Sequence, residues 1–553
     1  MKEELEKAYV QLLNTAHVKQ RNTESVNSII REALSDFIKR CCRPAIWPYG
    51  IHTRMLIADY IFEMKTVKYL IDEFCTWDTG GGFTLLRSSE IECNQIDGII
   101  ISSFKYREEI KATIRKNFPQ IKYLDIYQCL REHGIHLDCE YYAVEHPYMR
   151  YRDINRLKTE LAGQTDRNTR AKLQNELIVH LIQIKDFLTA ITLLNVWQEE
   201  DGSGQNQKLL ESLERIYKLE LLAASRVSEK NVLMLCVDGL LRRDLSAEQM
   251  KKLRNYIDQN TFYFSNAYSV STSTFESLIP AFGENADLRT KYYECNTVKE
   301  EECRFLKEAI AQDRHIYFYT DGCPYIESRH ILLKERFQTA SEKIWDFLLD
   351  AVDEENGLFY VHILYESHFS YPNPYTLEPI VAEGTSIFFD FLECNGGQLR
   401  TDYGSQKKDS LQYLCDLLTP FLSRLRCPMV LFADHGNCIL KKDSLLEDVK
   451  YPQLTFGNEL IQIPLAIRSR EIEIGSTSKI YSLMDLNEII VCLLRQEQLK
   501  LKDNDYIKVL RSEIYNEDFK YLYRKLGFEQ GLNSFEAFLF QDGWKLVVYA
   551  NGV

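Results

Sequence analysis

Several apolar runs of this chain end in side chains that could do chemistry. Asp238 follows NVLMLCV, a run typical of a fully buried strand. Thr274 stands in a hydroxyl-rich loop of residues 269–283 (SVSTSTFESLIPAFG), just before a predicted helix that starts near Phe275. The positive end of a helix dipole favours an alkoxide and an incoming phosphate. Thr274 is therefore a candidate nucleophile for phosphoryl chemistry.

Two further apolar runs carry imidazole and carboxylate groups. Residues 357–372 (GLFYVHILYESHFSYP) read as a buried strand that delivers His362 and His368 into a loop, and residues 428–437 (PMVLFADHGN) end in Asp434 and His435. Open α/β sheets place their sites at the carboxyl ends of parallel strands. We therefore expect these side chains to converge with Asp238 at one sheet edge.

Each position also has a purely structural explanation. Asp238 could cap a helix, Ser273 or Thr274 could be an ordinary N-cap, and Asp434-His435 could form a simple turn. Capping and a nucleophilic role are compatible at one helix N-terminus. The occurrence of all these positions in one chain favours the chemical interpretation.

Taken in order, the motifs resemble the alkaline phosphatase/sulfatase superfamily, and within it the phosphoethanolamine and phosphoglycerol transferase branch. The matching residues are Asp238, Thr274 in TFES, the H-x5-H-x2-Y-P run from His362 to Pro372, and Asp434-His435 in ADHGN. Residues 458–469, 482–494 and the FEAFLFQDGWKLVVYANG segment are similar to later elements of that family. The resemblance covers about residues 231–553 and implies an α/β fold with a mostly parallel sheet sandwiched by helices.

The resemblance also implies a metal site and a reaction. A divalent metal would be held by Asp238, Thr274, Asp434 and His435, while His368 and His362 would contact the substrate phosphate or a second metal. Oxygen ligands with one imidazole suit Zn²⁺ or Mn²⁺. In-line attack by Thr274 would give a phosphothreonine-type intermediate, which an acceptor hydroxyl or water resolves.

The sequence departs from the family pattern in two places. Sulfatases carry C/S-x-P-x-R, whereas Thr274 is followed by FESL, so sulfate-ester hydrolysis is disfavoured. Two-metal phosphodiesterases of the superfamily usually take a late histidine, and the sequence has none after His435. One tightly bound metal is therefore expected, and a second metal is the alternative.

These features lead to three functional hypotheses. The first is a metal-dependent transferase that moves a phospho-alcohol group from a small-molecule or nucleotide-activated donor to a glycan or sugar hydroxyl. The second is a phosphodiesterase or phosphatase that uses the same site with water as the acceptor. The third is a non-catalytic scaffold or binding module.

The part of the chain before residue 230 supplies other elements. We expect a helical segment over 1–40, a Rossmann-like α/β domain over 41–148, a helical linker over 149–229 and the catalytic domain over 230–553. In the Rossmann-like domain, Gly50 lies at a turn suited to a phosphate and Asp72 at a ribose-binding position, although a tight turn and a helix cap explain them more simply. This domain could bind a nucleotide donor, recognise an acceptor or mediate dimerisation.

Composition indicates which kinds of partner and which cellular compartment to expect. The 553 residues carry a net charge of −14 with no dense Lys/Arg stripe, which argues against nucleic-acid binding. The N-terminus does not read as a secretory signal, and the longest apolar stretches, such as 187–197, are too short to span a bilayer. The 15 cysteines are scattered, with no CxxC, so we expect reduced thiols in a cytoplasmic protein. His133, His136 and Cys139 have ligand-like spacing, but an ordinary loop is expected there.

Overall fold

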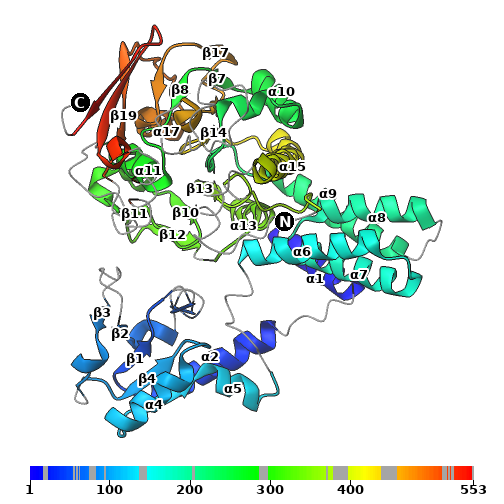
Figure 1. Ribbon diagram of the computed structural model, residues 1–553, viewed down its shortest axis with the longest axis vertical. Helices are drawn as coiled ribbons and strands as arrows, with labels where there is room; N and C mark the ends of the chain where they lie inside the picture. The colour runs from blue at the N-terminus through cyan, green and yellow to red at the C-terminus, as the bar shows by residue number, and fades with distance from the viewer. Residues whose placement is uncertain are drawn as a thin grey trace. The chain divides into compact units, whose positions relative to one another are not determined.

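The computed structural model divides the chain into two compact units (Figure 1). Unit 1 comprises Met1–Ala16, Tyr151–Lys334 and Gln338–Val553, and unit 2 comprises His17–Arg150 and Glu335–Phe337. The structure describes residues 1–16, 23–50, 52–53, 56–57, 60, 63–73, 83–92, 95–135, 146–201, 206–284, 297–334, 336–368, 371–377, 397–436, 458–513, 520, 524 and 529–550. His136 and Cys139 lie outside these residues.

Unit 2 is built on a five-stranded sheet in which every neighbouring pair is parallel. Its order is β3 (Thr84–Leu86), β2 (Tyr69–Ile71), β1 (Pro44–Trp47), β4 (Gly98–Ile101) and β5 (Lys122–Asp125). Side chains of the apolar strands β1 and β4 enter two separate cores, because successive residues point to opposite faces. Helices α2 (Thr23–Arg40) and α5 (Ile126–Glu132) pack in one core, and α4 (Arg107–Asn117) packs in the other. A parallel sheet with helices on both faces agrees with the Rossmann-like α/β fold expected for this part of the chain.

Unit 1 contains an eight-stranded, mostly parallel sheet. Its order is β12 (Ile331–Lys334), β10 (His315–Tyr319), β13 (Gly357–Ile363), β6 (Val232–Val237), β14 (Met429–Phe432), β16 (Leu465–Arg468), β7 (Phe262–Phe264) and β17 (Gly475–Thr477). The strands from β12 to β14 are parallel, while β16 is antiparallel to both of its neighbours. Every residue of β6, β13 and β14 is buried, as their almost entirely apolar sequences predict.

Two groups of helices cover this sheet (Figure 1). One group contains α10 (Lys251–Asn260), α13 (Ala340–Ala351) and α15 (Gly397–Arg424), and the other contains α11 (Thr274–Gly283), α12 (Arg304–Ala311) and α17 (Leu486–Arg495). The sandwich of helices around a parallel-rich sheet agrees with the predicted fold class. Unit 1 also contains three smaller sheets among the described residues. The first contains β15 (Gln462–Ile463), β8 (Ala267–Tyr268) and β18 (Tyr481–Ser482), and the second pairs β9 (Val298–Lys299) with β11 (Ile326–Glu327). The third contains β19 (Tyr506–Arg511), β20 (Phe535–Phe540) and β21 (Lys545–Tyr549).

The remaining helices of unit 1 come from the first part of the chain. They are α1 (Lys2–Thr15), α6 (Pro147–Gly163), α7 (Arg167–Gln183), α8 (Phe187–Asp201) and α9 (Gln207–Arg226). Helix α1 packs on α9 and α13, and α9 also packs on α13 and α15. Residues 1–40, expected as one helical segment, therefore divide between the units: α1 belongs to unit 1 and α2 to unit 2.

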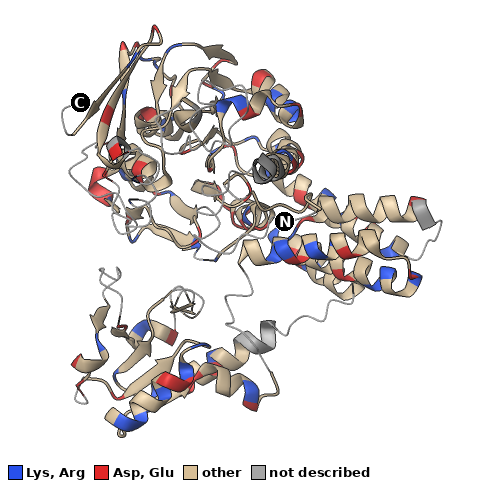
Figure 2. Cartoon of the chain, viewed as in Figure 1, with Lys and Arg blue, Asp and Glu red and all other residues tan. Residues whose placement is uncertain are grey.

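The helices carry charges of both signs. Figure 2 shows basic and acidic residues interspersed along α6 and α7. Among the described residues, no helix combines the length and the apolar character that crossing a membrane requires.

Asp186 is a buried carboxylate beside the first turn of α8. Its Oδ1 accepts a hydrogen bond from the Thr189 N–H at 3.2 Å, and its Oδ2 has no hydrogen-bond partner among the described residues. Burial raises the pKa of Asp186 to about 6, against the opposing effect of Thr189. An unfolded aspartate releases its proton near pH 4, so the folded chain holds one more proton between about pH 4 and pH 6. Stability should therefore fall as the pH rises through this range.

Replacing Asp186 with asparagine should remove this pH dependence. We expect Asp186→Asn to be more stable than the wild type by about 1–3 kcal/mol at pH 7, and equally stable near pH 4. Thermal unfolding at both pH values measures this difference, with the exposed Asp258→Asn as the control. An effect of Asp186→Asn that is equal at both pH values would contradict the raised pKa.

Candidate active site

The central strands of unit 1 bring two carboxylates to one edge of the sheet. Asp238 directly follows β6, Asp434 follows β14, and the register pairs Cys236 with Phe432, so the two aspartates stand at the same level. Both are fully buried. Gly239 has φ +67°, a left-handed conformation that favours glycine, and its N–H donates to Asp434 Oδ1 at 3.2 Å. The turn after β6 thus fixes Asp434 as well as Asp238.

Thr274 is the first residue of α11. Its hydroxyl donates to Asp238 Oδ2 at 3.1 Å, and its Oγ1 lies 3.2 Å from His435 Nε2. The N-cap residue Ser273 makes no side-chain capping bond. The hydroxyl of Thr274 is therefore directed at a carboxylate and an imidazole, at a helix end whose dipole favours negative charge.

His435 faces both carboxylates through one ring nitrogen. Its Nε2 lies 3.6 Å from Asp238 Oδ1 and 3.5 Å from Asp434 Oδ2. Its Nδ1 lies 2.8 Å from the Gly436 carbonyl, which can only accept, so Nδ1 carries a hydrogen. Burial lowers the pKa of His435, but Asp434 and Asp238 raise it more, so that the net shift is upward.

The two remaining histidines differ in position. His362 lies within β13, opposite Cys236, and is only 1% exposed, so the prediction that it lies in the loop after this strand is wrong. Its Nε2 is 3.3 Å from Asp238 Oδ2. His368 lies in the loop and is half-buried, and its ring centroid is 6.2 Å from that of His435. Of the two, His368 is the one that an incoming substrate can reach.

The donor atoms of this cluster suit a divalent cation. Asp238 Oδ1, Asp434 Oδ2 and His362 Nε2 are buried atoms with no hydrogen-bond partner among the described residues, although buried polar atoms are normally satisfied. One ligand atom each from Asp238, His368 and His435 lies within 4.8 Å of the others. Burial alone would raise the pKa of Asp238, but its three histidine neighbours lower it overall, which keeps the carboxylate charged. The residues present therefore fit a bound cation.

Glu276 positions the loop before Thr274. This buried carboxylate accepts from the Ser271 hydroxyl at 2.7 Å and from the Ser512 N–H at 3.2 Å. It thereby ties the start of α11 to the end of β19. The sequence did carry a signal for it, because Glu276 is the only charged residue in the otherwise apolar or small-residue segment TFESLIPAFG.

Tyr325 and Lys343 hold His362 from two directions, and sequence analysis missed both. The Tyr325 hydroxyl lies 3.3 Å from His362 Nδ1. The Lys343 ammonium donates to the His362 carbonyl at 2.6 Å and pairs with the buried Asp321. These contacts fix both the ring and the backbone of His362, so its Nε2 is held toward Asp238.

The loop that carries His368 is held by α6. The Tyr151 hydroxyl donates to Glu366 Oε1 at 2.5 Å, and the Ala340 N–H donates to the same oxygen at 2.8 Å. The Lys158 ammonium donates to the carbonyls of Pro374 and Tyr375, both at 2.7 Å. The loop is therefore fixed on either side of His368 by residues more than 200 positions away in the sequence.

Removing one of these contacts should affect substrate binding. Tyr151→Phe leaves the buried Glu366 with one hydrogen bond fewer, which should cost about 1–3 kcal/mol of stability. It should also raise KM, because the His368 loop loses a support. Thermal unfolding and steady-state kinetics test both effects, with the exposed Tyr506→Phe as the control. Wild-type values of Tm and KM in Tyr151→Phe would contradict the role of this contact.

Gly50 and Asp72 lie together in unit 2. Asp72 is 8% exposed, and its Oδ2 accepts from the Tyr49 N–H at 3.2 Å, so it braces the turn that contains Gly50. This contact explains the conformation of the turn without a ligand. The phosphate and ribose roles stay predictions.

Comparison with known proteins gives matches among solved structures alone. No family model and no curated protein matches the chain. The C-terminal periplasmic domain of phosphoethanolamine transferase EptC from Campylobacter jejuni is 15% identical, and the match covers 50% of this chain and 96% of that one, with a TM-score of 0.35. BT1596, a 2-O GAG sulfatase, is 13% identical over 58% of this chain and 83% of that one, with a TM-score of 0.40.

A third neighbour is the phosphonate monoester hydrolase SpPMH from Silicibacter pomeroyi. It is 12% identical over 58% of this chain and 89% of that one, with a TM-score of 0.41. At these low identities and TM-scores, the functional argument rests on the geometry of the site. A phosphoethanolamine transferase and a sulfatase, the kinds of protein that the sequence motifs resemble, are among these neighbours.

Proposed function

We propose that this protein is a metal-dependent phosphotransferase that moves a phospho-alcohol group to a glycan or sugar hydroxyl through a covalent adduct on Thr274. The observation that carries the proposal is the position of the Thr274 hydroxyl, at a helix N-terminus and within hydrogen-bond reach of both Asp238 and His435. A nucleophile needs an acceptor for its proton and a positive environment for its charge. Thr274 has both.

The cation that fits this site would be held by Asp238, Thr274, Asp434 and His435. When bound, it would lower the pKa of the Thr274 hydroxyl and neutralise charge on the phosphoryl oxygens. Zn²⁺ and Mn²⁺ both suit these ligands.

Each residue of the site has its own role in the first step. Thr274 Oγ1 attacks phosphorus as the bond to the leaving group of the donor breaks, and Asp238 Oδ2, which accepts the hydrogen bond of this hydroxyl, takes its proton. The N-terminus of α11 stabilises the added negative charge. His368, from the half-buried loop, contacts the phosphoryl oxygens. In the second step, an acceptor hydroxyl attacks phosphorus as the bond to Thr274 Oγ1 breaks, and the proton that the acceptor loses replaces the one that Thr274 gave up.

A soluble, nucleotide-activated alcohol phosphate is the donor class that we favour. Its leaving group is a nucleotide phosphate, which departs as an anion without needing a proton. A hydrolase with water as the acceptor is the second candidate, because the same site completes that reaction. A non-catalytic scaffold is the third, but it offers no account of the buried carboxylate and imidazole atoms that lack hydrogen-bond partners.

Intact-mass measurement after incubation with candidate donors tests the proposal. We expect a phospho-alcohol mass added to the full chain, mapped by peptide analysis to Thr274. Adding a glycan acceptor should discharge the adduct faster than water does if the protein is a transferase. Equal rates with and without the acceptor would favour the hydrolase. An absence of both adduct and turnover, with cation present, would favour the scaffold.

A further inference from the structure

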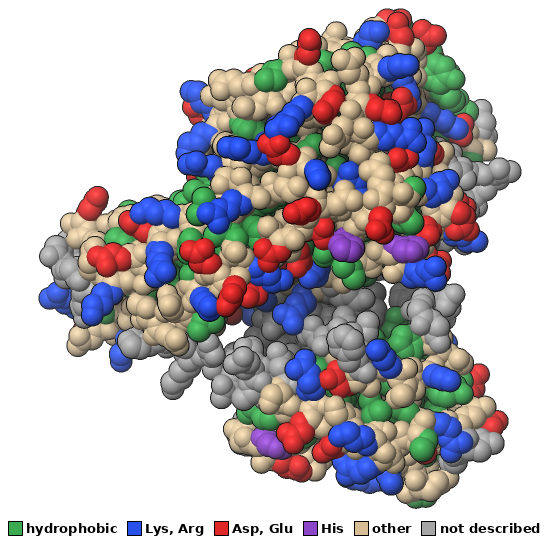
Figure 3. Space-filling model, turned by 180° about the vertical axis from the view of Figure 1, so that it is seen from behind, with side chains coloured by type: hydrophobic (Ala, Val, Ile, Leu, Met, Phe, Trp, Pro, Cys, Tyr) green, Lys and Arg blue, Asp and Glu red, His purple; other side chains and the backbone are tan. Residues whose placement is uncertain are grey.

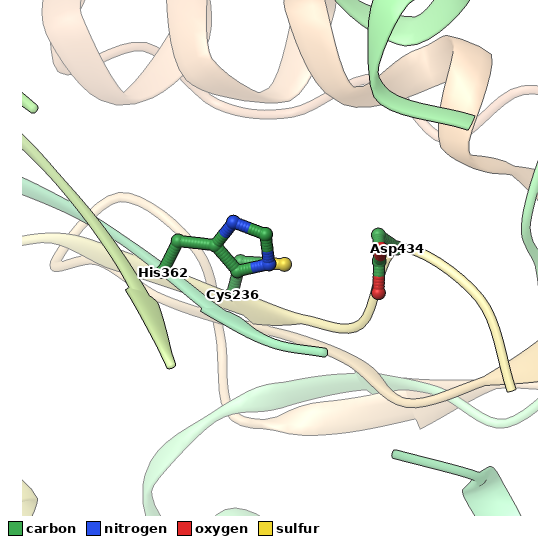
Figure 4. Close-up of side chains that lie close together, drawn as sticks. All are labelled: Cys236, His362 and Asp434. Carbon is green, nitrogen blue, oxygen red and sulfur yellow. The ribbon is translucent and has the colours of Figure 1, made fainter. Parts of the chain in front are cut away.

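Cys236 lies beside the candidate active site and has no role in the mechanism above. It is the penultimate residue of β6, is completely buried and pairs in register with His362 on β13. Its Sγ, a ring nitrogen of His362 and a carboxylate oxygen of Asp434 all lie within 4.8 Å of one another. Figure 4 shows the thiol next to the His362 ring, with Asp434 beyond it at the end of β14.

We propose that Cys236, His362 and Asp434 form a second cation site that selects Zn²⁺ over Mn²⁺. A thiolate is a soft ligand, and soft ligands favour zinc, whereas Mn²⁺ prefers oxygen. The inference extends the proposed function through Asp434, whose two carboxylate oxygens allow it to serve both cations. None of the ligands that the resemblance implies is a cysteine, so the inference adds Cys236 to that set.

The free atoms of the cluster support this assignment. His362 Nε2 and Asp434 Oδ2 are buried and have no hydrogen-bond partner among the described residues. The Tyr325 hydroxyl, 3.3 Å from His362 Nδ1, can accept the Nδ1–H, which leaves the Nε2 lone pair for a cation. An outer hydrogen bond of this kind is usual for a metal-binding histidine.

The spacing of the donor atoms is close to that of a zinc site. Zn–S bonds of about 2.3 Å and Zn–N bonds of about 2.0–2.1 Å place tetrahedral donors roughly 3.4–3.8 Å apart. Because the donor atoms of this cluster lie within 4.8 Å of one another, zinc binding would need them to move closer by no more than about 1.4 Å. Asp238, His368 and His435 form another group with the same limit and share no residue with this one, so Asp238 and His435 stay available to the first cation.

Charge compensation also favours a cation at this position. Binding of Zn²⁺ would release the proton of the Cys236 thiol to solvent and place the thiolate beside a positive charge. A second positive charge would also offset the repulsion between Asp238 and Asp434, which lie buried side by side.

Cobalt titration of the full-length, reduced protein tests the inference, because Co²⁺ adopts zinc sites and reports thiolate ligation by its absorption. We expect the wild type to bind two equivalents of Co²⁺ and to show a thiolate-to-cobalt charge-transfer band in the near ultraviolet. Excess Zn²⁺ should abolish the band. Cys236→Ser, a nearly isosteric change, should lose the band and bind one equivalent. Cys303→Ser, at another fully buried cysteine, should keep both.

The outcomes separate this inference from the proposed function. A wild type that binds one equivalent without the charge-transfer band overturns the second site and leaves the Thr274 mechanism intact. A band that persists in Cys236→Ser also overturns it, because another cysteine would then be the ligand. The wild-type spectrum decides the question even if Cys236→Ser fails to fold. The Thr274 adduct is measured independently, by mass.

Discussion

Replacing Thr274 with alanine should abolish turnover of a phosphodiester substrate and prevent any covalent phospho-adduct. The reason is that the Thr274 hydroxyl lies within hydrogen-bond distance of both Asp238 Oδ2, at 3.1 Å, and His435 Nε2, at 3.2 Å. Loss of a catalytic nucleophile leaves only the acceleration that binding and electrostatics supply. We expect kcat/KM to fall by at least about 1,000-fold. Intact-mass spectra and hydrolysis of a p-nitrophenyl phosphodiester measure the two effects.

The matched control for this variant is Ser273→Ala. Ser273 is the neighbouring hydroxyl at the same helix end, and it makes no side-chain capping bond, so its loss should change kcat/KM by less than about threefold. Thr274→Ala should keep the wild-type melting temperature to within a few degrees, because it deletes one small, half-buried side chain. Thr274→Ala with wild-type turnover, or an adduct that maps to another residue, would refute the nucleophile assignment.

Replacing Asp434 with asparagine should remove bound metal together with activity. The substitution keeps the shape of the side chain and its acceptor for the Gly239 N–H, but it deletes the negative charge that a cation needs. We expect the metal content of dialysed protein to fall below about one tenth of the wild-type value, with a loss of at least about 100-fold in kcat/KM. Elemental analysis by mass spectrometry measures the metal directly.

A surface aspartate provides the control for this change. Asp503→Asn removes an exposed carboxylate that pairs with Lys479 at 3.2 Å, and it should leave metal content and activity unchanged. Stoichiometric metal in Asp434→Asn would exclude this carboxylate as a ligand. If Asp434→Asn lost its metal but kept its activity, the reaction would not need the cation, and the proposed mechanism would be refuted.

The sequence predicted the centre of the site because its signals are local. The strands β6, β13 and β14 are almost entirely apolar and therefore need both faces of a sheet covered, and polar residues that follow such strands lie at the sheet edge. Asp238 and Asp434 could therefore be named before the fold was known. His362 was misplaced because a histidine near the end of an apolar run reads equally well as the last strand residue or the first loop residue.

The supports of the site could not be predicted in this way. Tyr151 and Glu366 are 215 positions apart, and neither residue has a neighbour in sequence that indicates the pairing. The same holds for α1 and α2, which have similar amphipathic patterns but pack in different units. Such contacts depend on which apolar faces pack together in three dimensions. The residues next to each position in the sequence do not indicate this. Figure 3 shows charged side chains of both signs scattered over the face in view, with hydrophobic side chains between them.

The packing of α1 and α6–α9 within unit 1 determines how far the chain can be shortened. A fragment beginning at residue 230 would lose Tyr151 and Lys158, and with them the anchors of Glu366 and of the Pro374 and Tyr375 carbonyls. It would also uncover the apolar faces of α13 and α15 on which α9 lies. The smallest self-sufficient piece therefore begins near residue 147 and still needs α1, supplied as a separate peptide or joined at a new position. The N-terminal limit of the catalytic part of this protein is therefore set by helices α1 and α6–α9, and not by β6.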